Sequence, residues 1–398
     1  MPKALIVPPQ AIFAAFFLLL FFTKFQKLTD CCLNPWGLCI FFLLSWLCIS
    51  DLINVIAVGG WQEFRYFAGR AIFIVLVFAT YAFIRNENTY RSVLQLVTLS
   101  VVVLASITIL CGLLHINPFG ADTSRHPRIF WGIMMPTERA IGVPMSYGEY
   151  GLIMNSVLPL FFVSFFKKGF LYSRSLSLSG IILILGALMI TQSRNSWLAT
   201  STVLLFLVFF LTIGIHEPSL KAFGVFTIVS VALLMAALLQ DQLQFLFNGF
   251  ALGRQSQTFF NRLAVDRLAY SVFLSNWLFG VGHKELDHRI ITELGLNTVV
   301  HNGYIDQLAS NGIFGFMPYF LLMILAILLL TRTFLKGPTS YRMYALCLAG
   351  SFVGNMAVLS AYKGTFSETA AIQYGLLLSL MDITNKKKLT DDDDYKRY

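Results

Sequence analysis

Charged residues are scarce in this chain. Only 12% of its 398 residues are Asp, Glu, Lys or Arg, whereas 57% are hydrophobic, and the mean hydropathy is +0.72. Soluble globular domains usually carry about 25% charged residues. This balance excludes a soluble fold and predicts a protein that is embedded in a membrane.

Several signatures of cofactor chemistry are also missing. The sequence has no glycine-rich phosphate loop and no His or Cys cluster with metal-ligand spacing. Outside the acidic run at 391–394 it has no Asp-x-Asp pair of the kind that holds a divalent ion for nucleotide-sugar chemistry. The six cysteines all fall in or beside apolar runs, which is typical of buried free thiols. We therefore expect neither a metal site nor an organic cofactor.

Eleven apolar runs are long enough to cross a bilayer as helices. They lie at about 5–24, 34–56, 67–85, 91–113, 147–166, 174–193, 195–214, 219–239, 312–331, 342–361 and 366–383. A twelfth segment, short or re-entrant, could lie around 125–140. No small-residue cleavage site follows the first run, so we interpret it as a span. The sequence predicts an all-α polytopic membrane protein with 11 or 12 transmembrane helices in one membrane domain, 1–398.

The basic residues of the short loops predict the orientation. Lys and Arg gather in alternate loops, which the positive-inside rule places in the cytoplasm together with the tail at 384–398. We expect the end of this tail, 391–397, to be solvated and disordered. The remaining loops, which include 57–66, 114–146 and the long segment 240–311, then face outward. Arg dominates on that side and Lys on the other. The net charge of +9 therefore favours contact with anionic membrane lipids, not nucleic acid.

The segment 240–311 is the one long polar interruption of the chain. Its many aromatic residues indicate that it can bury a small core. Apolar residues at helical spacing over 258–277 predict an amphipathic helix that lies on the membrane or caps a cavity. Residues 303–312 predict a short helix that enters the ninth span, with His301 just before its start.

Arg194 lies in a tight turn, 193–195, between two predicted spans. A lone charge so close to hydrocarbon is costly. Contact with lipid phosphate is one interpretation, and an arginine that faces an internal cavity is the other. The second is favoured because lipid contact alone would not need the polar neighbours Gln192, Ser193, Asn195 and Ser196.

Two arginines and a histidine are the candidates in the long loop. Arg262 and Arg267 are five residues apart, so on a helix they are offset by roughly 140° and cannot easily grip one group. We expect one of them to be functional and the other structural or solvated. His301 is the residue type best suited to take a proton near neutral pH, although a lone loop histidine is more often structural.

Asp51 and Arg70 lie near the outer ends of neighbouring spans. We expect them to pair across these spans in a structural role.

The order and spacing of these motifs resemble the bacterial O-antigen ligase and polymerase superfamily, which are membrane glycosyltransferases of the GT-C type. The resemblance is strongest over about 185–335, and the N-terminal half matches only in being hydrophobic. It rests on Ser193-Arg194, on Arg262 fifteen residues before Trp277, and on the segments 279–282, 301–304 and 312–315. The segment Arg139-Ala140-Ile141-Gly142 looks like the family's first outer loop.

The resemblance implies an enzyme of the bacterial inner membrane whose active site faces the periplasm. Its donor would be a glycan linked through diphosphate to undecaprenol. Arg194 and Arg262 would bind this diphosphate and stabilise its developing charge, which would make the transfer metal-independent. His301 would orient or deprotonate an acceptor sugar hydroxyl, with inversion at the donor sugar. Further substrate-binding candidates are Arg139, Arg254, Arg267, Asn302 and Glu149.

The acceptor and the class of protein have alternatives. The stretch 301–306 favours a polymerase, which joins the growing glycan to the next repeat unit. The modest length and compact outer loop equally fit a ligase, which joins the finished glycan to lipid A–core. A lipid-linked glycan transporter or flippase would carry ionisable residues at mid-span. Here they cluster at the predicted outer face, which favours surface chemistry.

Overall fold

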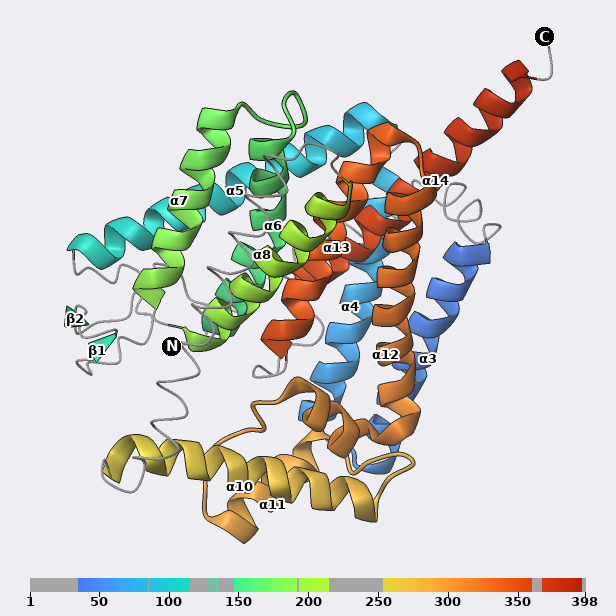
Figure 1. Ribbon diagram of the computed structural model, residues 1–398. Coiled ribbons are helices and arrows are strands. Elements are labelled where there is room, and N and C mark those ends of the chain that lie inside the picture. Colours follow the sequence, from blue (N-terminus) through green and yellow to red (C-terminus); the bar gives the residue numbers. More distant parts are fainter. Residues whose placement is uncertain are drawn as a thin grey trace, which may run out of the picture. The chain divides into compact units, whose positions relative to one another are not determined.

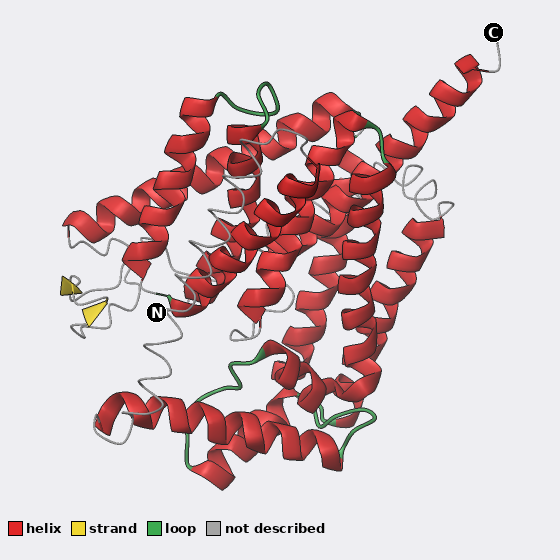
Figure 2. Ribbon diagram, in the orientation of Figure 1, coloured by secondary structure: helices red, strands yellow, loops and turns green. Residues whose placement is uncertain are grey.

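The computed structural model describes residues 35–84, 86–114, 147–191, 193–214, 253–359 and 367–395, and a short strand pair near 130. The strands are β1 (Ile129–Phe130) and β2 (Ile133–Met134), which run antiparallel. The remaining elements of these residues are eleven helices (Figures 1 and 2). Eight of the described helices are long and apolar enough to cross a membrane. The predicted all-α polytopic membrane fold is therefore confirmed.

Eight predicted spans coincide with these eight helices. They are α3 (Pro35–Ala57), α4 (Trp61–Phe83), α5 (Glu87–Leu114), α6 (Tyr147–Phe166), α7 (Arg174–Thr191), α8 (Arg194–Gly214), α12 (Gly303–Lys336) and α13 (Thr339–Leu359). The runs predicted at 5–24 and 219–239, and most of the segment 125–140, lie outside the described residues.

The last predicted span, 366–383, falls in α14 (Glu368–Tyr395), which is not among the eight apolar helices. This helix continues through most of the segment 384–398. The prediction of a disordered end at 391–397 is therefore wrong as far as Tyr395. Lysine and leucine are strong helix formers, and the Lys386 ammonium donates to the Asp382 carboxylate one turn earlier, at 2.9 Å.

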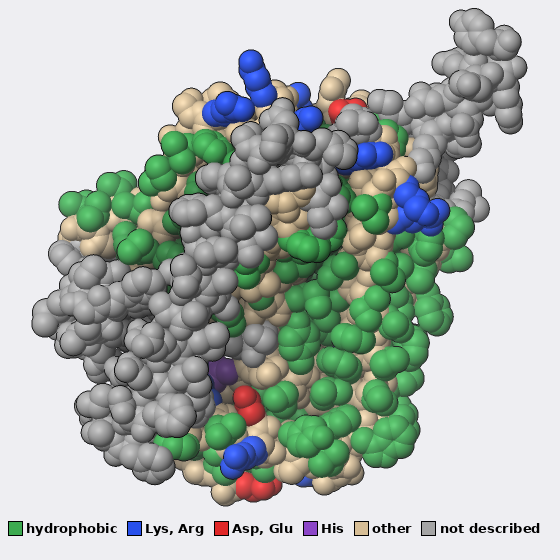
Figure 3. Space-filling model, in the orientation of Figure 1, with side chains coloured by type: hydrophobic (Ala, Val, Ile, Leu, Met, Phe, Trp, Pro, Cys, Tyr) green, Lys and Arg blue, Asp and Glu red, His purple; other side chains and the backbone are tan. Residues whose placement is uncertain are grey.

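The chain divides into two compact units. One contains 1–90, 258–329 and 365–398, and the other contains 91–257 and 330–364. In the first unit α4 packs against α3 and α14, and α11 (His283–Leu294) packs against α4. Gly375 allows close approach of α14, because a Cβ there would meet Val77 and Thr80 of α4. Figure 3 shows hydrophobic side chains over α3 and α12, as expected for faces that meet lipid.

The second unit is a bundle around α6. This helix packs against α7, α8 and α13, and α13 also packs against α8. Two glycines mark the closest approaches. A Cβ at Gly180 of α7 would collide with the Phe161 ring of α6, and one at Gly354 of α13 would collide with Val203 of α8. Small residues let backbones approach in this way, as is usual between membrane helices.

The predicted outer loop at 57–66 is mostly helical. α3 ends at Ala57 and α4 already begins at Trp61, so only residues 58–60 connect them. Hydropathy failed here because Gln62, Glu63 and Arg65 lower the average of the first turns of α4. Those turns carry polar side chains that contact α11, and they belong to the site described next.

Candidate functional site

His301 lies in the turn that starts α12, immediately before a capped helix end. The Asn302 side-chain oxygen accepts hydrogen bonds from the backbone N–H groups of Tyr304 at 3.0 Å and Ile305 at 3.2 Å. The backbone carbonyl of Asn302 accepts a hydrogen bond from the Asp306 N–H at 2.9 Å. This is an N-cap, which explains why asparagine suits position 302. The cap fixes the chain direction at His301, whose side chain is half-buried.

A backbone seam holds α12 against the segment that precedes α11. The N–H groups of Ile313 and Phe314 donate to the carbonyls of Trp277 and Leu278, at 2.8 and 3.0 Å. In return, the N–H groups of Val281 and Gly282 donate to residues 309 and 310 of α12, at 3.1 and 2.8 Å. The predicted short helix 303–312 is confirmed, because α12 breaks at Gly312 (φ 60°, ψ −169°).

Glycine is required on both sides of this seam. Gly280 and Gly312 have φ values of 69° and 60°, which L side chains rarely adopt. A Cβ on Gly280 would lie 2.4 Å from the Ser310 carbonyl, and one on Gly312 would lie 2.4 Å from the Leu278 carbonyl. The two segments therefore fit together only as bare backbone, which places the start of α12 firmly.

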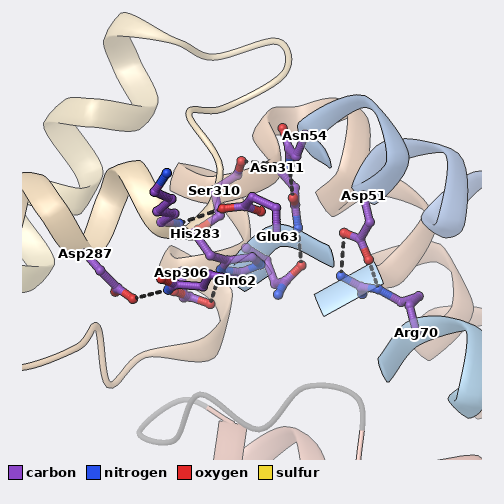
Figure 4. A network of polar contacts seen from close by, with 12 residues as sticks. Asp51, Asn54, Gln62, Glu63, Arg70, His283, Asp287, Asp306, Ser310 and Asn311 are labelled. Atoms are coloured by element: carbon purple, nitrogen blue, oxygen red, sulfur yellow. Dashed lines mark hydrogen bonds and ion pairs between the residues drawn. The ribbon is translucent and has the colours of Figure 1, made fainter. Parts of the chain in front are cut away.

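A buried polar network links this seam to α3 (Figure 4). The Asn54 amide donates to the Asn311 side-chain oxygen at 2.5 Å and to the Ser310 carbonyl at 3.2 Å. The Asn311 amide then donates to the Gln307 side-chain oxygen at 2.8 Å. These residues are nearly inaccessible to solvent. Buried amides that satisfy one another in this way make the arrangement specific.

The predicted pairing of Asp51 and Arg70 is present. Arg70 donates from Nε and from a terminal nitrogen to the two Asp51 oxygens, at 2.6 and 2.9 Å (Figure 4). Both side chains are only 3% exposed. The contact is the bidentate arrangement that suits guanidinium and carboxylate. It joins α3 to α4 and serves as a structural tie.

Helix α11, which the sequence did not predict, is tied to α4. The Lys284 backbone N–H donates to the Glu63 carboxylate at 2.6 Å, and the Gln62 amide donates to the Asp287 carboxylate at 2.7 Å (Figure 4). Glu63 is 2% exposed and faces the start of α11, where an acid complements the helix dipole. These two contacts hold α11 across the first turns of α4.

A buried histidine connects α11 to α12 as well. His283 is 1% exposed, and its Nδ1 lies 3.6 Å from an oxygen of Asp306 in α12. Its ring stacks on the Tyr66 ring of α4, with centroids 3.8 Å apart and an interplanar angle of 23°. Figure 4 shows His283 and Asp306 near one another at this junction. Three helices thus meet close to the turn that carries His301.

Helix α10 (Gly253–Ser275) corresponds to the amphipathic helix predicted at 258–277. Its buried face is Val265, Ala269 and Val272, which pack with Leu286 and Ile290 of α11 in one apolar cluster. α10 and α11 lie side by side (Figure 1). The larger apolar residues Tyr270, Leu274 and Trp277 are more than half exposed instead. The helix therefore has one face for α11 and a second apolar face outside this unit's core.

Arg262 and Arg267 both extend from exposed positions on α10. Asp266 lies one turn after Arg262 and is half-buried. Burial raises the pKa of the Asp266 carboxyl, and the nearby Arg262 charge partly offsets that effect. Arg262 therefore has an acidic neighbour close enough on its own helix for the two charges to interact.

Arg194 begins α8 in the second unit, and its side chain lies outside the described residues. Of the polar cluster predicted around it, Ser193 and Ser196 are buried, whereas Gln192 lies outside the described residues. Ser196 donates to the Ser193 hydroxyl at 2.9 Å, and Asn155 of α6 donates to the Ser196 carbonyl at 3.3 Å. Thr200 donates to the Asn155 side-chain oxygen at 2.9 Å. These contacts fix the start of α8 against α6.

The other predicted binding residues are less informative. Glu149 is half-buried on the first turn of α6, in the same unit as α8. Arg139 lies outside the described residues, and so does the side chain of Arg254 on α10. The structure therefore gathers His301, Asn302, Arg262 and Arg267 in one unit and places Arg194 and Glu149 in the other. Within the described residues, no group of three His, Cys, Asp or Glu side chains could hold a metal ion.

The sequence motifs alone missed His283, Asp306, Glu63 and Gln62. A signal for α11 was available, because Leu286, Ile290 and Leu294 recur at helical spacing before Gly295, which ends the helix in a left-handed conformation. The partners in α4 carried no such signal, since more than 200 residues separate them from α11.

One comparison with known proteins agrees with the sequence motifs. Residues 179–320 match a protein-family model described as O-Antigen ligase. That span includes Arg194, Arg262 and His301. Over these residues, the match supports the predicted resemblance to the O-antigen ligase and polymerase superfamily.

A chain of the solved structure described as "Structural coordination of polymerization and crosslinking by a peptidoglycan synthase complex" is also similar. It is 12% identical, with a TM-score of 0.49, over 88% of this chain and 98% of that chain. A likeness at this level supports no inference about activity. No curated protein sequence matches this chain.

Proposed function

We propose that this chain, which carries the O-antigen ligase family domain in residues 179–320, is a membrane glycosyltransferase. It transfers a glycan from an undecaprenyl diphosphate donor to a sugar hydroxyl at the periplasmic face of the bacterial inner membrane. The observation that carries the proposal is the family match, which includes the three residues singled out for catalysis. The multi-pass helical fold provides the membrane setting that a lipid-linked donor needs.

In this proposal His301 acts on the acceptor. The acceptor hydroxyl loses its proton to His301 while its oxygen forms a bond to the anomeric carbon of the donor sugar. The bond from that carbon to the diphosphate breaks, and undecaprenyl diphosphate departs with the electron pair. Attack from the face opposite the diphosphate inverts the anomeric configuration. The capped start of α12 and the glycine seam support this role, because a general base needs a fixed position.

The arginines act on the donor. Arg262 and Arg194 bind the diphosphate through charge-assisted hydrogen bonds and stabilise the negative charge that grows on it as the sugar leaves. Guanidinium groups supply here the positive charge that a divalent metal supplies in other glycosyl transfers. Arg139, Arg254, Arg267 and Glu149 are further candidates for contacts with the diphosphate or the glycan.

The acceptor distinguishes two versions of the function. The stretch 301–306 favours the polymerase, in which the acceptor is the next repeat unit. The modest length and compact outer loop equally fit the ligase, in which the acceptor is lipid A–core, and the family match does not distinguish the two. Both versions use the same donor and the same residues, so they differ only in the second substrate.

Complementation in two deletion strains tests the proposal. One strain lacks its O-antigen polymerase and the other lacks its ligase. Both strains make the same lipid-linked donor glycan as the organism from which this chain comes. Lipopolysaccharide is resolved on a gel after expression of the wild type, His301→Ala, Arg262→Gln or Arg289→Gln. The last is a control that removes a charge paired with Glu285 on α11. Immunoblots of membranes verify insertion of each variant.

A restored ladder in the first strain assigns chain extension, and restored long chains in the second assign transfer to lipid A–core. Arg289→Gln should restore the same product as wild type, whereas His301→Ala and Arg262→Gln should restore none. Full rescue by His301→Ala would contradict the catalytic assignment. Failure of the inserted wild type in both matched strains would contradict the proposed function itself.

A further inference from the structure

A pocket that the proposed mechanism does not use lies between the first turns of α4 and the start of α11. It has a volume of ≈ 640 Å³ and is lined by Trp61, Gln62, Arg65, Tyr66 and Lys284. All five belong to the same compact unit as His301. The volume falls within the range of about 300–1,000 Å³ that is typical of small-molecule sites.

The wall of this pocket is positively charged. Arg65 and Lys284 are both exposed, and within the part of the chain that the structure describes neither side chain makes an ion pair. The carboxylates of Glu63 and Asp287 bond to other groups, since Glu63 accepts from a backbone N–H and Asp287 accepts from Gln62. Two cations without acidic partners favour an anionic ligand.

Two aromatic side chains also line the pocket. Trp61 is 72% exposed and stacks on Phe64, with ring centroids 5.4 Å apart. Tyr66 is half-buried and stacks on His283. Exposed aromatic faces beside cationic and amide groups suit a sugar ring, which offers an apolar face and polar edges. A lipid phosphate would need only the two cations, and not the half-buried Tyr66 and Gln62 of the lining.

The pocket is built on rigid supports. Tyr66 rests on His283, which contacts Asp306 on the first turns of α12. Gly60 leaves room for the lysine, because a Cβ at position 60 would lie 3.2 Å from Lys284 Nζ. The same contacts that hold the lining therefore join it to the helix whose start carries His301.

We propose that Trp61, Gln62, Arg65, Tyr66 and Lys284 form a subsite for an anionic sugar, one that bears a carboxylate or a phosphate, within the glycan that the enzyme transfers or extends. This subsite rests on the proposed function for its place in the reaction. Arg65 and Lys284 bind the anionic group, and Trp61 and Tyr66 pack against the ring. The subsite selects acidic over neutral glycans next to the acceptor side of the reaction.

Binding to the full-length protein in detergent micelles tests the subsite. The probes are tetragalacturonate and the neutral maltotetraose, each titrated by isothermal calorimetry. The proteins are the wild type, Arg65→Gln, Lys284→Gln, the control Arg289→Gln and the transfer-deficient His301→Ala. Each variant is first shown to match the wild type in thermal unfolding.

We expect tetragalacturonate to bind the wild type at least 10-fold more tightly than maltotetraose. Arg65→Gln and Lys284→Gln should each lower the affinity for tetragalacturonate about 10-fold. Arg289→Gln should change this affinity less than 2-fold. His301→Ala should bind like the wild type, so loss of transfer and loss of this subsite are distinguishable. Added phosphatidylglycerol should leave the affinity unchanged.

Four results would overturn the subsite. Equal affinity for the acidic and the neutral probe would exclude a subsite specific for an anionic sugar. The absence of detectable tetragalacturonate binding to the wild type would exclude it too. Unchanged affinity in Arg65→Gln and Lys284→Gln would place the probe elsewhere. The fourth result is that phosphatidylglycerol displaces tetragalacturonate from the wild type but not from the same two variants. That result would assign the pocket to lipid head groups.

Discussion

Asp51 and Arg70 show what a buried charge pair demands of single residues. Both side chains are almost fully buried and face each other in a bidentate contact. Removing one partner leaves the other charge uncompensated in a medium of low polarity, which costs about 3–5 kcal/mol. We predict that Asp51→Asn lowers the free energy of unfolding by about that amount, as measured by thermal unfolding in detergent.

A matched exposed pair provides the control. Arg289 and Glu285 form an ion pair on α11 with side chains 35% and 39% exposed. Because water screens such a pair, Glu285→Gln should cost less than about 1 kcal/mol. If Asp51→Asn were as stable as Glu285→Gln, the buried pair would not be the structural tie that we infer between α3 and α4.

Asp266 predicts a pH dependence. Burial raises the pKa of its carboxyl above the ordinary 3.8, and Arg262 lowers it in part. The folded chain thus holds this proton more tightly than the unfolded chain. The stability contributed by Asp266 therefore falls as the pH rises from 3.8 through the raised pKa, and is constant above it.

We predict that Asp266→Asn gains thermal stability relative to wild type as the pH rises across that interval. The gain should then level off. Arg262→Gln should move the upper end of the interval to higher pH, because it removes the charge that lowers the pKa. The measurement is the unfolding temperature of each protein as a function of pH. A wild-type-to-variant difference that stays flat over the acid range would contradict the assignment.

At the scale of elements, the seam between residues 277–282 and α12 decides where His301 lies. Its two glycines combine positive φ values with backbone contacts that leave no space for a side chain. We predict that Gly312→Ala and Gly280→Ala each abolish accumulation of folded protein or lower the unfolding temperature strongly. Size-exclusion profiles and thermal unfolding measure both effects.

A substitution at Gly295 tests the effect of backbone strain without a steric clash. It ends α11 with a φ of 64°, yet a Cβ there would meet nothing within 4 Å. Gly295→Ala should therefore cost only the backbone strain of about 1 kcal/mol. Equal stability of Gly295→Ala and Gly312→Ala would mean that the close approach of the two segments adds nothing.

The sequence was informative about elements wherever one strong local signal was present. Apolar runs predicted eight spans, and the helical period predicted α10 and the short helix that starts α12. The start of α4 was missed because its polar turns lower the local hydropathy. Helix α11 was missed because only three apolar positions at helical spacing mark it within a polar loop. Long-range contacts such as His283 with Tyr66 and Asp306 leave no local pattern, so the pocket beside them could not be predicted.

At the scale of the whole molecule, membrane orientation is the broadest prediction. The charge pattern places Lys168 in the cytoplasm and Arg267 on the outer side. In a chain whose native cysteines are replaced, Arg267→Cys should react with a membrane-impermeant maleimide in intact spheroplasts. Lys168→Cys should react only after lysis. Both positions are exposed, so access to the side chain does not limit the reaction. The opposite labelling pattern would show that the topology is inverted, and it would contradict a site on the periplasmic side.

The central claim is that His301 and Arg262 carry out glycan transfer from a diphosphate-linked lipid. The most direct measurement is the release of undecaprenyl diphosphate by purified protein supplied with its lipid-linked donor and an acceptor glycan. We predict that His301→Ala lowers the turnover rate by on the order of 10²–10⁴ with donor binding unchanged. Arg262→Gln should lower both the turnover rate and the affinity for the donor, and Arg289→Gln should change neither quantity. Turnover by His301→Ala at the wild-type rate would contradict the account.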